Sequence, residues 1–456
     1  MIKMRRSIQM RCISLVHFVL NTGIMMTAWL LWCAPLIDTP DAQTMSLAIC
    51  ACYMVFSIFL FRTYNAYKIG MYRAGEVFYA QTLANLFSNA ITYLFACLIR
   101  LLPVWPVLAA FCGQTIVSAA WCLWANKLYF RLHPPMKTLV LYETDDDFEK
   151  LNEIVSFENR FDVQKKMKSP GTIYEILPKL NDYQAVIVSG IEATLRNGIV
   201  KACIDKDIDC YFIPHTGDVI IAGAKHLQSF SIPIMSARRA VLRPEYAFAK
   251  RTLDALLAAL GLVIASPVML ITAIAIKAYD NGPVIYRQVR LTKDGKPFEI
   301  LKFRSMRVDA EKDGVARLAA DQDSRITPVG RITRTVHFDE LPQLWNILRG
   351  DMSIVGPRPE RPEIAAQYEQ EMPAFSLRLQ VKAGLTGTAQ VYGRYNTEPR
   401  DKLKMDLMYI NNMSLGEDLK LIFATVKIMF MKERTAGVQL GQVTAAKAGV
   451  AEKKSA

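Results

Sequence analysis

The stretch KRTLDALLAALGLVIASPVMLITAIAIKAYDNGPVIYRQVR, residues 250–290, decides how the rest of this chain can be arranged. Its apolar core, residues 253–278, exceeds the length of about 20 residues that a helix needs to span a bilayer. Pro267 lies in the middle of this core, directly after Ser266. Because proline removes one backbone hydrogen bond and clashes with the preceding turn, a helix should kink here, and the Ser266 hydroxyl can bond the backbone group that is released.

Basic residues flank this segment on both sides. They are Lys250 and Arg251 on the near side, and Lys277, Arg287 and Arg290 on the far side. A helix that crosses a membrane usually has unequal charge at its two ends, whereas a helix that enters one leaflet and turns back leaves both ends on the same face. We therefore predict a re-entrant membrane helical hairpin over residues 250–278, with its break at Ser266 and Pro267; a kinked span is the alternative.

The composition is that of a membrane protein with basic surfaces. Of 456 residues, 52% are hydrophobic, and the formal net charge is +13. Positive charge on an apolar chain is typical of cytoplasmic faces that contact anionic lipids. Nucleic acid is the competing partner for a basic chain, but the long apolar segments argue against it. The nine cysteines include no CxxC pair and the five histidines are scattered, so the sequence predicts neither a zinc site nor a disulfide framework.

Four apolar runs precede this segment and predict an N-terminal four-helix transmembrane unit, residues 1–136. The runs are residues 12–36, 46–62, 80–102 and 104–126. Lys and Arg are concentrated before the first run, between the second and third, and after the fourth. Since basic loops face the cytoplasm, both ends of this unit and the soluble domains beyond it are predicted to be cytoplasmic.

The next part, residues 137–240, predicts a Rossmann-like α/β domain. Strand-like runs such as KTLVLY (137–142) and QAVIVSG (184–190) alternate with helical patterns such as DDDFEKLNEIVSF (145–157). Strands that alternate with helices indicate a parallel sheet. The turn after the first strand, YETDDD (142–147), lacks the glycines that let backbone amides approach a pyrophosphate, and its aspartates would repel phosphate. We therefore predict a scaffold or regulatory module that binds no nucleotide.

Two adjacent carboxylates, Asp339 and Glu340, stand out in the polar region beyond the hydrophobic segment. They lie in VHFDELPQLWNILRGDMSIVGPRP, residues 336–359. Adjacent side chains diverge on a strand or a helix, so this pair is poorly placed to flank one glycosidic bond. The pair precedes the helical pattern LPQLWNIL (341–348), and the positive potential of a helix N-terminus keeps a carboxylate ionised and attracts phosphate. Such a carboxylate can act as a nucleophile toward phosphorus or can bind Mg²⁺.

Four basic side chains are candidates for binding phosphate beside this pair. Arg358 lies between two prolines in GPRP, which restrict the backbone and fix the guanidinium for bidentate contact. The others are Arg334, five residues before Asp339, and Lys302 and Arg304 in LKFRSM. Taken singly, Asp339 could be only a helix cap and Arg358 only a surface arginine in a rigid turn. The combination of carboxylate pair, arginines and membrane hairpin favours a phosphate site.

Four segments together resemble the bacterial sugar transferases, also described as polyprenyl-phosphate hexose-1-phosphate transferases or monotopic phosphoglycosyl transferases. They are KRTLDALLAALGLVIASPVMLITAIAIK (250–277), GPVIYRQVRLTKDGKPFEILKFRSM (282–306), DELPQLWNILRGDMSIVGPRPERPE (339–363) and VKAGLTGTAQVYGRYN (381–396). The resemblance assigns residues 241–437 to a mostly helical catalytic domain. The N-terminal helices and the α/β domain are similar to those of the long-form members, which prime exopolysaccharide, capsule or O-antigen synthesis.

The resemblance implies transfer of a sugar 1-phosphate from a UDP-sugar to undecaprenyl phosphate, with release of UMP. Asp339 matches the nucleophile that forms a phosphosugar–aspartyl intermediate, and Glu340 matches its partner in the pair. The family needs Mg²⁺ near these carboxylates. Arg334 and Arg358 match phosphate-binding arginines, and Lys302 matches the lysine of the KFRSM block.

Further features follow from the same resemblance. Asp406, in KLKMDLMYI, matches another acidic position and is expected among the phosphate- or substrate-binding residues, with its exact role left open. Ser266-Pro267 matches the break of the family's re-entrant helix. A multi-pass protein of the bacterial inner membrane is implied, in contact with membrane lipids, and a homodimer is compatible with it. Thr388 and the AGL sequence at 383–385 depart from the common pattern, so glucose, galactose and N-acetylated sugars all stay open.

Two other functions are weighed against this one. The first is a non-enzymatic membrane sensor or assembly scaffold, which suits the N-terminal helices and the α/β domain. The second is a glycosyltransferase that transfers only the sugar and releases UDP. The tail, residues 438–456, has little hydrophobic periodicity and is predicted to be disordered.

Overall fold

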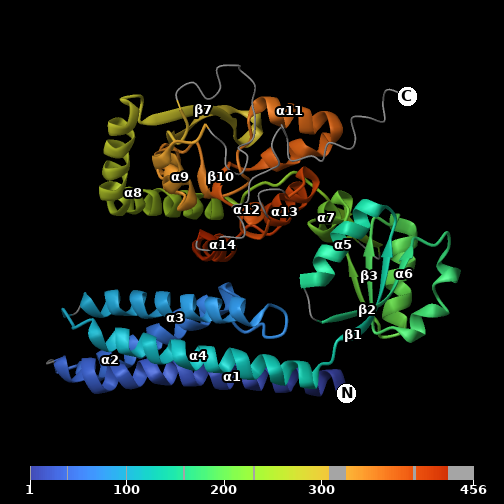
Figure 1. Ribbon diagram of the computed structural model, residues 1–456, viewed down its shortest axis with the longest axis horizontal. Coiled ribbons are helices and arrows are strands. Elements are labelled where there is room, and N and C mark those ends of the chain that lie inside the picture. Colours follow the sequence, from blue (N-terminus) through green and yellow to red (C-terminus); the bar gives the residue numbers. More distant parts are fainter. Residues whose placement is uncertain are drawn as a thin grey trace. The chain divides into compact units, whose positions relative to one another are not determined.

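The structure is a computed structural model that describes residues 2–37, 40–98, 100–157, 160–229, 232–307, 325–393 and 397–429. The chain divides into two compact units, residues 1–214 and 215–456, and each is described by itself (Figure 1). The tail at 438–456, for which the sequence predicts disorder, lies outside the described residues.

The N-terminal unit begins with four long helices (Figure 1). They are α1 (Ile2–Ala28), continued by a π-helical turn at Trp29–Cys33 and a 3-10 turn at Ala34–Leu36, then α2 (Ala42–Thr63), α3 (Ala74–Cys97) and α4 (Trp105–Leu132). Four described segments are long and apolar enough to cross a membrane: Cys12–Leu36, Ala42–Thr63, Trp105–Leu132 and Pro244–Asp280. Helix α3 covers most of the third predicted run but is not one of these four.

Helix α3 buries polar side chains against its neighbours. Asn85 donates a hydrogen bond to Asn21 of α1 at 3.0 Å, and Asn89 donates one to Gln114 of α4 at 2.9 Å. Gln114 in turn donates to the hydroxyl of Tyr53 on α2 at 2.8 Å. Interhelical hydrogen bonds of this kind stabilise helix association where lipid removes the hydrophobic driving force.

A four-stranded sheet follows, in the order β2-β1-β3-β4, and every neighbouring pair of strands is parallel. The strands are β1 (Met136–Tyr142), β2 (Phe161–Lys168), β3 (Ala185–Ser189) and β4 (Asp209–Phe212); the helices are α5 (Asp145–Phe157) and α6 (Ala193–Asp205), with 3-10 turns at Ile173–Glu175 and Lys179–Asp182. Val140 and Ile187 pack with Leu151 of α5, whereas Leu139 packs with Ile199 of α6. Because both faces are covered, the central strands are continuous apolar runs.

A carboxylate lies at the first turn of α5, beside the carboxyl ends of β1 and β3. Asp147 Oδ2 accepts hydrogen bonds from the Thr144 backbone N–H at 3.2 Å and from its hydroxyl at 2.6 Å, and Ser189 donates to Oδ1 at 3.0 Å. A Cβ atom at Gly190 would lie 2.2 Å from Asp147 Oδ2. This carboxylate fills the place where a dinucleotide phosphate would meet the helix N-terminus, which favours a scaffold or regulatory role; that role stays a prediction.

The C-terminal unit combines short strands with eight α-helices in its described residues. The helices are α7 (Thr216–Ala222), α8 (Pro244–Asp280), α9 (Pro328–Thr335), α10 (Gln343–Arg349), α11 (Pro362–Glu371), α12 (Thr388–Tyr392), α13 (Pro399–Asn411) and α14 (Leu415–Met429), with a 3-10 helix at Pro373–Gln380. Two antiparallel hairpins pair β5 (Lys225–Ser229) with β6 (Ile232–Ser236) and β7 (Ile285–Leu291) with β8 (Pro297–Phe303), while β9 (Ser353–Val355) pairs in parallel with β10 (Gly384–Thr386). Ile347, Met352, Leu403 and Leu421 are fully buried in one core that these elements share.

The division between the units falls earlier than the predicted boundary after residue 240. Helix α7 packs on α13, where Asn411 donates to the carbonyl of Val219 at 2.8 Å. A Cβ atom at Gly223 would also collide with the Asn411 side chain. Residues from His215 onward are therefore part of the C-terminal unit by their packing.

Helix α8 is 37 residues long and is not straight: its ribbon turns sharply partway along (Figure 1). Pro267 lies inside it, and the Ser266 hydroxyl donates to the carbonyl of Val263 at 2.8 Å. Apolar side chains on both sides of this position are exposed, such as Val263 at 72% and Ile271 at 67%. A proline explains the bend, and the exposed apolar surface calls for an apolar surrounding.

Both ends of α8 are bonded to the same compact unit. Near its start, Lys250 donates to Asp418 of α14 at 2.9 Å, and the backbone N–H of Ile354 on β9 donates to Asp254 at 3.1 Å. At its end, Asp280 forms an ion pair with Arg304, which directly follows β8. The apolar middle of the helix thus extends from a base that is fixed at two places.

Candidate active site

Asp339 and Glu340 lie in a 3-10 turn, Phe338–Glu340, that joins α9 to α10. His337 precedes the turn with a φ of 56°, in the left-handed region, and this redirects the chain after α9. Pro342 then comes just before the first residue of α10. The predicted helix at 341–348 therefore begins two residues later, and the carboxylates lie on a tight turn ahead of it.

Glu340 is held by two cations at one oxygen. Its Oε1 accepts a hydrogen bond from Lys302 Nζ at 3.0 Å and one from Arg358 Nη2 at 2.9 Å. Burial alone would raise the pKa of Glu340, but Lys302 and Arg358 together hold that pKa well below its usual range. Glu340 is therefore ionised at neutral pH and fixes the positions of both cations.

Asp339 has a different environment although it is the adjacent residue. It is only 8% exposed. Burial and the neighbouring charge of Glu340 raise the pKa of Asp339 above its usual range, against the opposing charges of Lys302 and Arg334. The more basic of two carboxylates is the stronger nucleophile once it is ionised, and the turn holds one carboxylate paired with cations beside one whose pKa is raised.

Arg334, in the last turn of α9, acts on Asp339 through its charge. Within the described part of the chain, its Nη1 is buried and has no hydrogen-bond partner. A buried guanidinium nitrogen without an acceptor costs free energy, and an incoming phosphate oxygen would satisfy it. Its position therefore suits the phosphate-binding role that the resemblance implies.

The loop that carries Arg358 is brought close to the site by backbone contacts that only glycine permits. A Cβ atom at Gly356 would lie 2.4 Å from the carbonyl oxygen of Lys382, and one at Gly384 would lie 2.1 Å from the Gly356 nitrogen. The short strands β9 and β10 can pair here because neither position has a side chain. Arg358 is 46% exposed at its side chain, so a ligand can reach it while it contacts Glu340.

Two predicted site residues have partners outside the carboxylate pair. Arg304 forms its ion pair with Asp280 at the end of α8. Asp406, on α13, is 1% exposed and accepts hydrogen bonds from Arg378 Nε at 2.9 Å and Nη2 at 2.7 Å. Burial raises the pKa of Asp406 to about 6, since desolvation of the carboxylate outweighs the attraction of Arg378.

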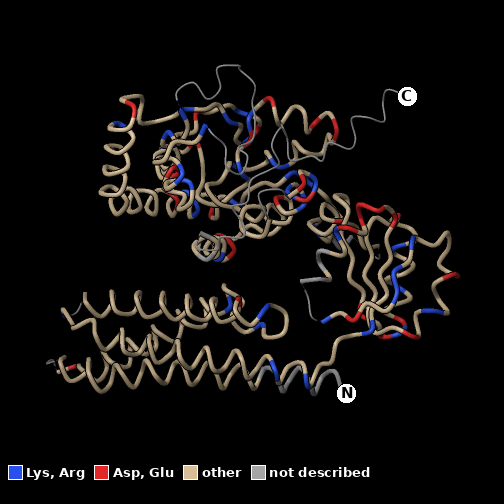
Figure 2. Tube along the Cα trace, viewed as in Figure 1, with Lys and Arg blue, Asp and Glu red and all other residues tan. Residues whose placement is uncertain are grey.

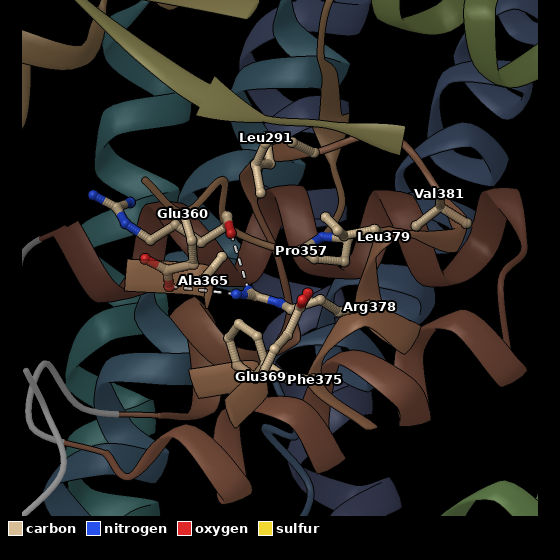
Figure 3. A pocket seen from close by; sticks show the side chains of 11 residues that line it. Leu291, Pro357, Glu360, Ala365, Glu369, Phe375, Arg378, Leu379 and Val381 are labelled. Carbon is tan, nitrogen blue, oxygen red and sulfur yellow. Dashed lines mark hydrogen bonds and ion pairs between the residues drawn. The ribbon is translucent and has the colours of Figure 1, made fainter. Parts of the chain in front are cut away.

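In the sequence, Arg290 is only a basic residue that flanks the hydrophobic segment and Arg378 has no predicted role, but both contact the loop of Arg358. Arg378 donates to the carbonyl of Arg358 at 3.0 Å, and Arg290 donates to the carbonyl of Pro359 at 3.0 Å. Figure 3 shows Arg378 beside Phe375, with its guanidinium reaching Glu360. Arg378 lies in SLRLQV and Arg290 in YRQVRL, where an alternating apolar and basic pattern looks like ordinary surface sequence.

The charges around this site are mixed rather than uniformly basic. Figure 2 shows Lys and Arg interleaved with Asp and Glu across the C-terminal unit. Within the described residues, no group of three or more His, Cys, Asp and Glu side chains is placed to bind a metal ion. Any metal at the carboxylate pair would therefore need ligands from a substrate or from water in addition to Asp339 and Glu340.

Comparison with known proteins places this site in a recognised context. A family model described as "Bacterial sugar transferase" matches residues 245–432, which contain every residue of the site. An Aeromonas hydrophila UDP-N-acetylgalactosamine-undecaprenyl-phosphate N-acetylgalactosaminephosphotransferase is 42% identical over 187 residues, which is 40% of this chain and 44% of that protein.

Two UDP-glucose:undecaprenyl-phosphate glucose-1-phosphate transferases are also similar. The protein of Escherichia coli K12 is 38% identical over 261 residues, 56% of this chain and 54% of its own length. The protein of Caulobacter vibrioides is 44% identical over 182 residues, 39% of this chain and 68% of its own length. The chain thus spans about half the length of the first two relatives and two thirds of the third.

Proposed function

This chain belongs to the bacterial sugar transferase family, and we propose that it transfers a sugar 1-phosphate from a UDP-sugar to undecaprenyl phosphate, releasing UMP. The relatives whose names state this class of reaction share the part of the chain that holds the site. The observation that supports it most directly is the unequal environment of Asp339 and Glu340, which suits one residue for attack and the other for binding cations. The product would prime an exopolysaccharide, capsule or O-antigen.

The chemistry proceeds in two displacements at one phosphorus. An oxygen of Asp339 attacks the sugar-bearing phosphorus of the donor, a bond between them forms, and the bond from that phosphorus to the bridging oxygen breaks. UMP leaves with the bridging oxygen and its electron pair. A phosphate oxygen of undecaprenyl phosphate then attacks the same phosphorus, the bond to Asp339 breaks, and the lipid diphosphate sugar is released.

The cations lower the barrier to attack on a phosphate that already carries negative charge. Arg358 is partly exposed, and Arg334 has a buried donor without a partner among the described residues, so both can bind phosphate oxygens. Lys302 is held by Glu340 and adds positive charge beside Asp339. Glu340 thus acts mainly by keeping two cations in place.

Mg²⁺ is part of the proposal. In phosphate-transfer sites this ion is bound by one or two carboxylates together with substrate phosphate and water, and two adjacent buried carboxylates fit that pattern. Asp339 and Glu340 would hold it, and when bound it would neutralise charge on the donor phosphates.

We further propose that α8 is a re-entrant membrane helix and that the catalytic domain lies at the cytoplasmic face of the bacterial inner membrane. The bend at Pro267, the exposed apolar middle and the two fixed ends of α8 support this topology. A helix whose ends are both bonded to one compact unit returns to the side from which it entered. The acceptor phosphate lies at that interface, so the geometry would present Asp339 at headgroup depth. The parallel sheet of residues 136–212 supports a Rossmann-like module whose role is scaffolding or regulation.

One experiment separates this proposal from its two rivals. Purified protein is incubated with Mg²⁺, undecaprenyl phosphate and a panel of UDP-sugars that includes glucose, galactose and N-acetylated sugars. We expect UMP with at least one donor, and that donor identifies the sugar. Release of UDP would indicate a glycosyltransferase instead, and no nucleotide product from any donor would favour a sensor or scaffold.

A further inference from the structure

The loop that carries Arg358 has few backbone donors of its own. Pro357 and Pro359 have no N–H group, so the segment depends on bonds that its carbonyl oxygens accept. The Pro357 carbonyl accepts from the backbone N–H of Gly384 at 2.9 Å, and the next three carbonyls are bonded from two flanking elements. Arg358 accepts from Arg378 Nη2, Pro359 accepts from Arg290 Nη1, and Glu360 accepts from the backbone N–H of Leu291, each at 3.0 Å.

The donors come from two elements that flank the loop. Arg290 and Leu291 are on β7, and Arg378 is on the 3-10 helix Pro373–Gln380. Arg290 is itself oriented by Gln288, whose Oε1 accepts from its Nε at 3.1 Å and from its Nη2 at 2.6 Å. The loop is therefore fixed from two sides by side chains that are fixed in turn.

Arg378 is the more deeply buried of the two guanidinium groups, with only 3% of its side chain exposed. Asp406 accepts from its Nε and Nη2, Glu360 accepts from its Nη1 at 3.3 Å, and its guanidinium carbon lies 4.8 Å from the centre of the Phe375 ring. Figure 3 shows Arg378 and Glu360 converging beside Phe375. A planar fork can bond two carboxylates and one carbonyl in one plane, whereas a lysine ammonium cannot reproduce that geometry.

We propose that Arg378, held by Asp406, and Arg290 are positioning residues that fix the direction of Arg358. Both donate to main-chain carbonyls of its loop, Arg378 also bonds the Glu360 side chain, and the Arg358 guanidinium then meets Glu340 at 2.9 Å. This proposal gives a role to Asp406, which lies outside the carboxylate pair. Its carboxylate binds Arg378, and Arg378 in turn donates to the main-chain carbonyl of Arg358. The inference rests on the proposed function, because Arg358 is taken to bind the donor phosphate.

The test is a double-mutant cycle on the rate of the first displacement, measured as UMP released in a single turnover. Arg378→Lys keeps the positive charge between Asp406 and Glu360 but loses the planar guanidinium that bonds both carboxylates and the Arg358 carbonyl. A misplacement of about 1 Å in a catalytic site can cost about 100-fold in rate, and we expect a loss of that size from Arg378→Lys alone. In an Arg358→Ala background the same change should alter the rate by no more than about twofold, because its effect passes through Arg358.

Two further variants keep the test decisive if Arg378→Lys does not fold, as judged by its thermal transition. Asp406→Asn keeps an acceptor oxygen for Arg378, and Arg290→Lys leaves Asp406 and Arg378 unchanged. Each should lower the rate in the wild-type background and have little further effect beside Arg358→Ala. Arg287→Lys is the matched control: it lies on the same strand, its side chain is 68% exposed, and we expect no change in rate.

Equal losses in both backgrounds would overturn the positioning role, since a merely structural residue weakens the protein whether or not Arg358 is present. An unchanged rate in Arg378→Lys would overturn it as well. These outcomes require a wild-type protein that releases UMP. A wild-type protein that releases none with any donor would overturn the proposed function itself, so the two failures are distinguishable.

Discussion

Arg358 donates a hydrogen bond to Glu340 across 2.9 Å, although 18 residues separate them in the chain. Glu340 is thereby paired with a cation, which helps to lower its pKa. Asp339 beside it is buried, and its pKa is raised. Adjacent residues with the same functional group thus have different electrostatic environments.

Replacing Asp339 by Asn should remove turnover. The amide cannot form the acyl phosphate that links Asp339 to the sugar phosphate, so UMP release should fall by at least about 10⁴-fold, the scale of loss when a covalent nucleophile is removed. In the wild-type protein without acceptor lipid, mass spectrometry should find the phosphosugar on the peptide that contains Asp339.

Glu340→Gln is the informative comparison for that variant. It removes the charge that holds Lys302 and Arg358 but leaves the Asp339 oxygens in place, so we expect a smaller loss, about 10²- to 10³-fold, and a detectable adduct. Full turnover by Asp339→Asn, or an adduct on Glu340 alone, would contradict the assignment of the two carboxylates.

Removal of Mg²⁺ should stop the reaction. With EDTA in excess, the donor phosphates keep their charge and UMP release should fall to background, and it should return when Mg²⁺ is added back. Ca²⁺ prefers more ligands at longer distances and should restore activity poorly. Full turnover in EDTA would show that the arginines and Lys302 suffice without a metal.

Stability should depend on pH through Asp406. Burial raises its pKa from the ordinary 3.8 to about 6, so between these values the folded protein holds this proton more tightly than the unfolded chain does. The contribution of Asp406 to the free energy of unfolding is therefore full below about pH 4 and is lost as the pH rises through about 6, by up to about 3 kcal/mol.

Thermal unfolding of the wild type and of Asp406→Asn from pH 4 to 7 checks this. Relative to the variant, which has no titrating group at this position, the transition temperature of the wild type should fall as the pH rises. Parallel curves for the two proteins would mean that Asp406 has the same pKa in the folded and unfolded states.

The topology of α8 can be read by labelling. Lys296 is exposed, in the turn between β7 and β8 just after α8, and a cysteine placed there should not react with a membrane-impermeant thiol reagent applied to intact cells. Asp41→Cys, in the first predicted outside loop, is the positive control, and both variants carry serine at the exposed Cys12 and Cys112. Reaction at position 296 under these conditions would indicate a kinked span that crosses the bilayer.

The local features of this protein could be read from its sequence. Among the described residues, four helices have the length and apolar composition of membrane segments. Pro267 lies within the bent helix α8, and Asp339 and Glu340 lie beside the start of a helix as expected. Hydrophobic length, a missing backbone donor and adjacency along the chain act over a few residues, so their effect is visible without the fold. The third apolar run also forms a helix, as its local pattern predicts. The partners of its buried polar side chains lie on other helices, so they could not be read from that pattern.

Which charges meet was decided only by the tertiary structure. Arg304 and Asp406 were expected near the phosphate site from their place in motifs, yet folding pairs the first with Asp280, 24 residues away, and the second with Arg378, 28 residues away. No sequence motif marks Arg290 and Arg378 as site residues. They reach the site because β7 and a 3-10 helix flank a proline-rich loop, whose carbonyls accept their hydrogen bonds and which has few donors of its own. A sequence lists charged groups in order, but ion pairs depend on distance and burial, and these exist only once the chain has packed.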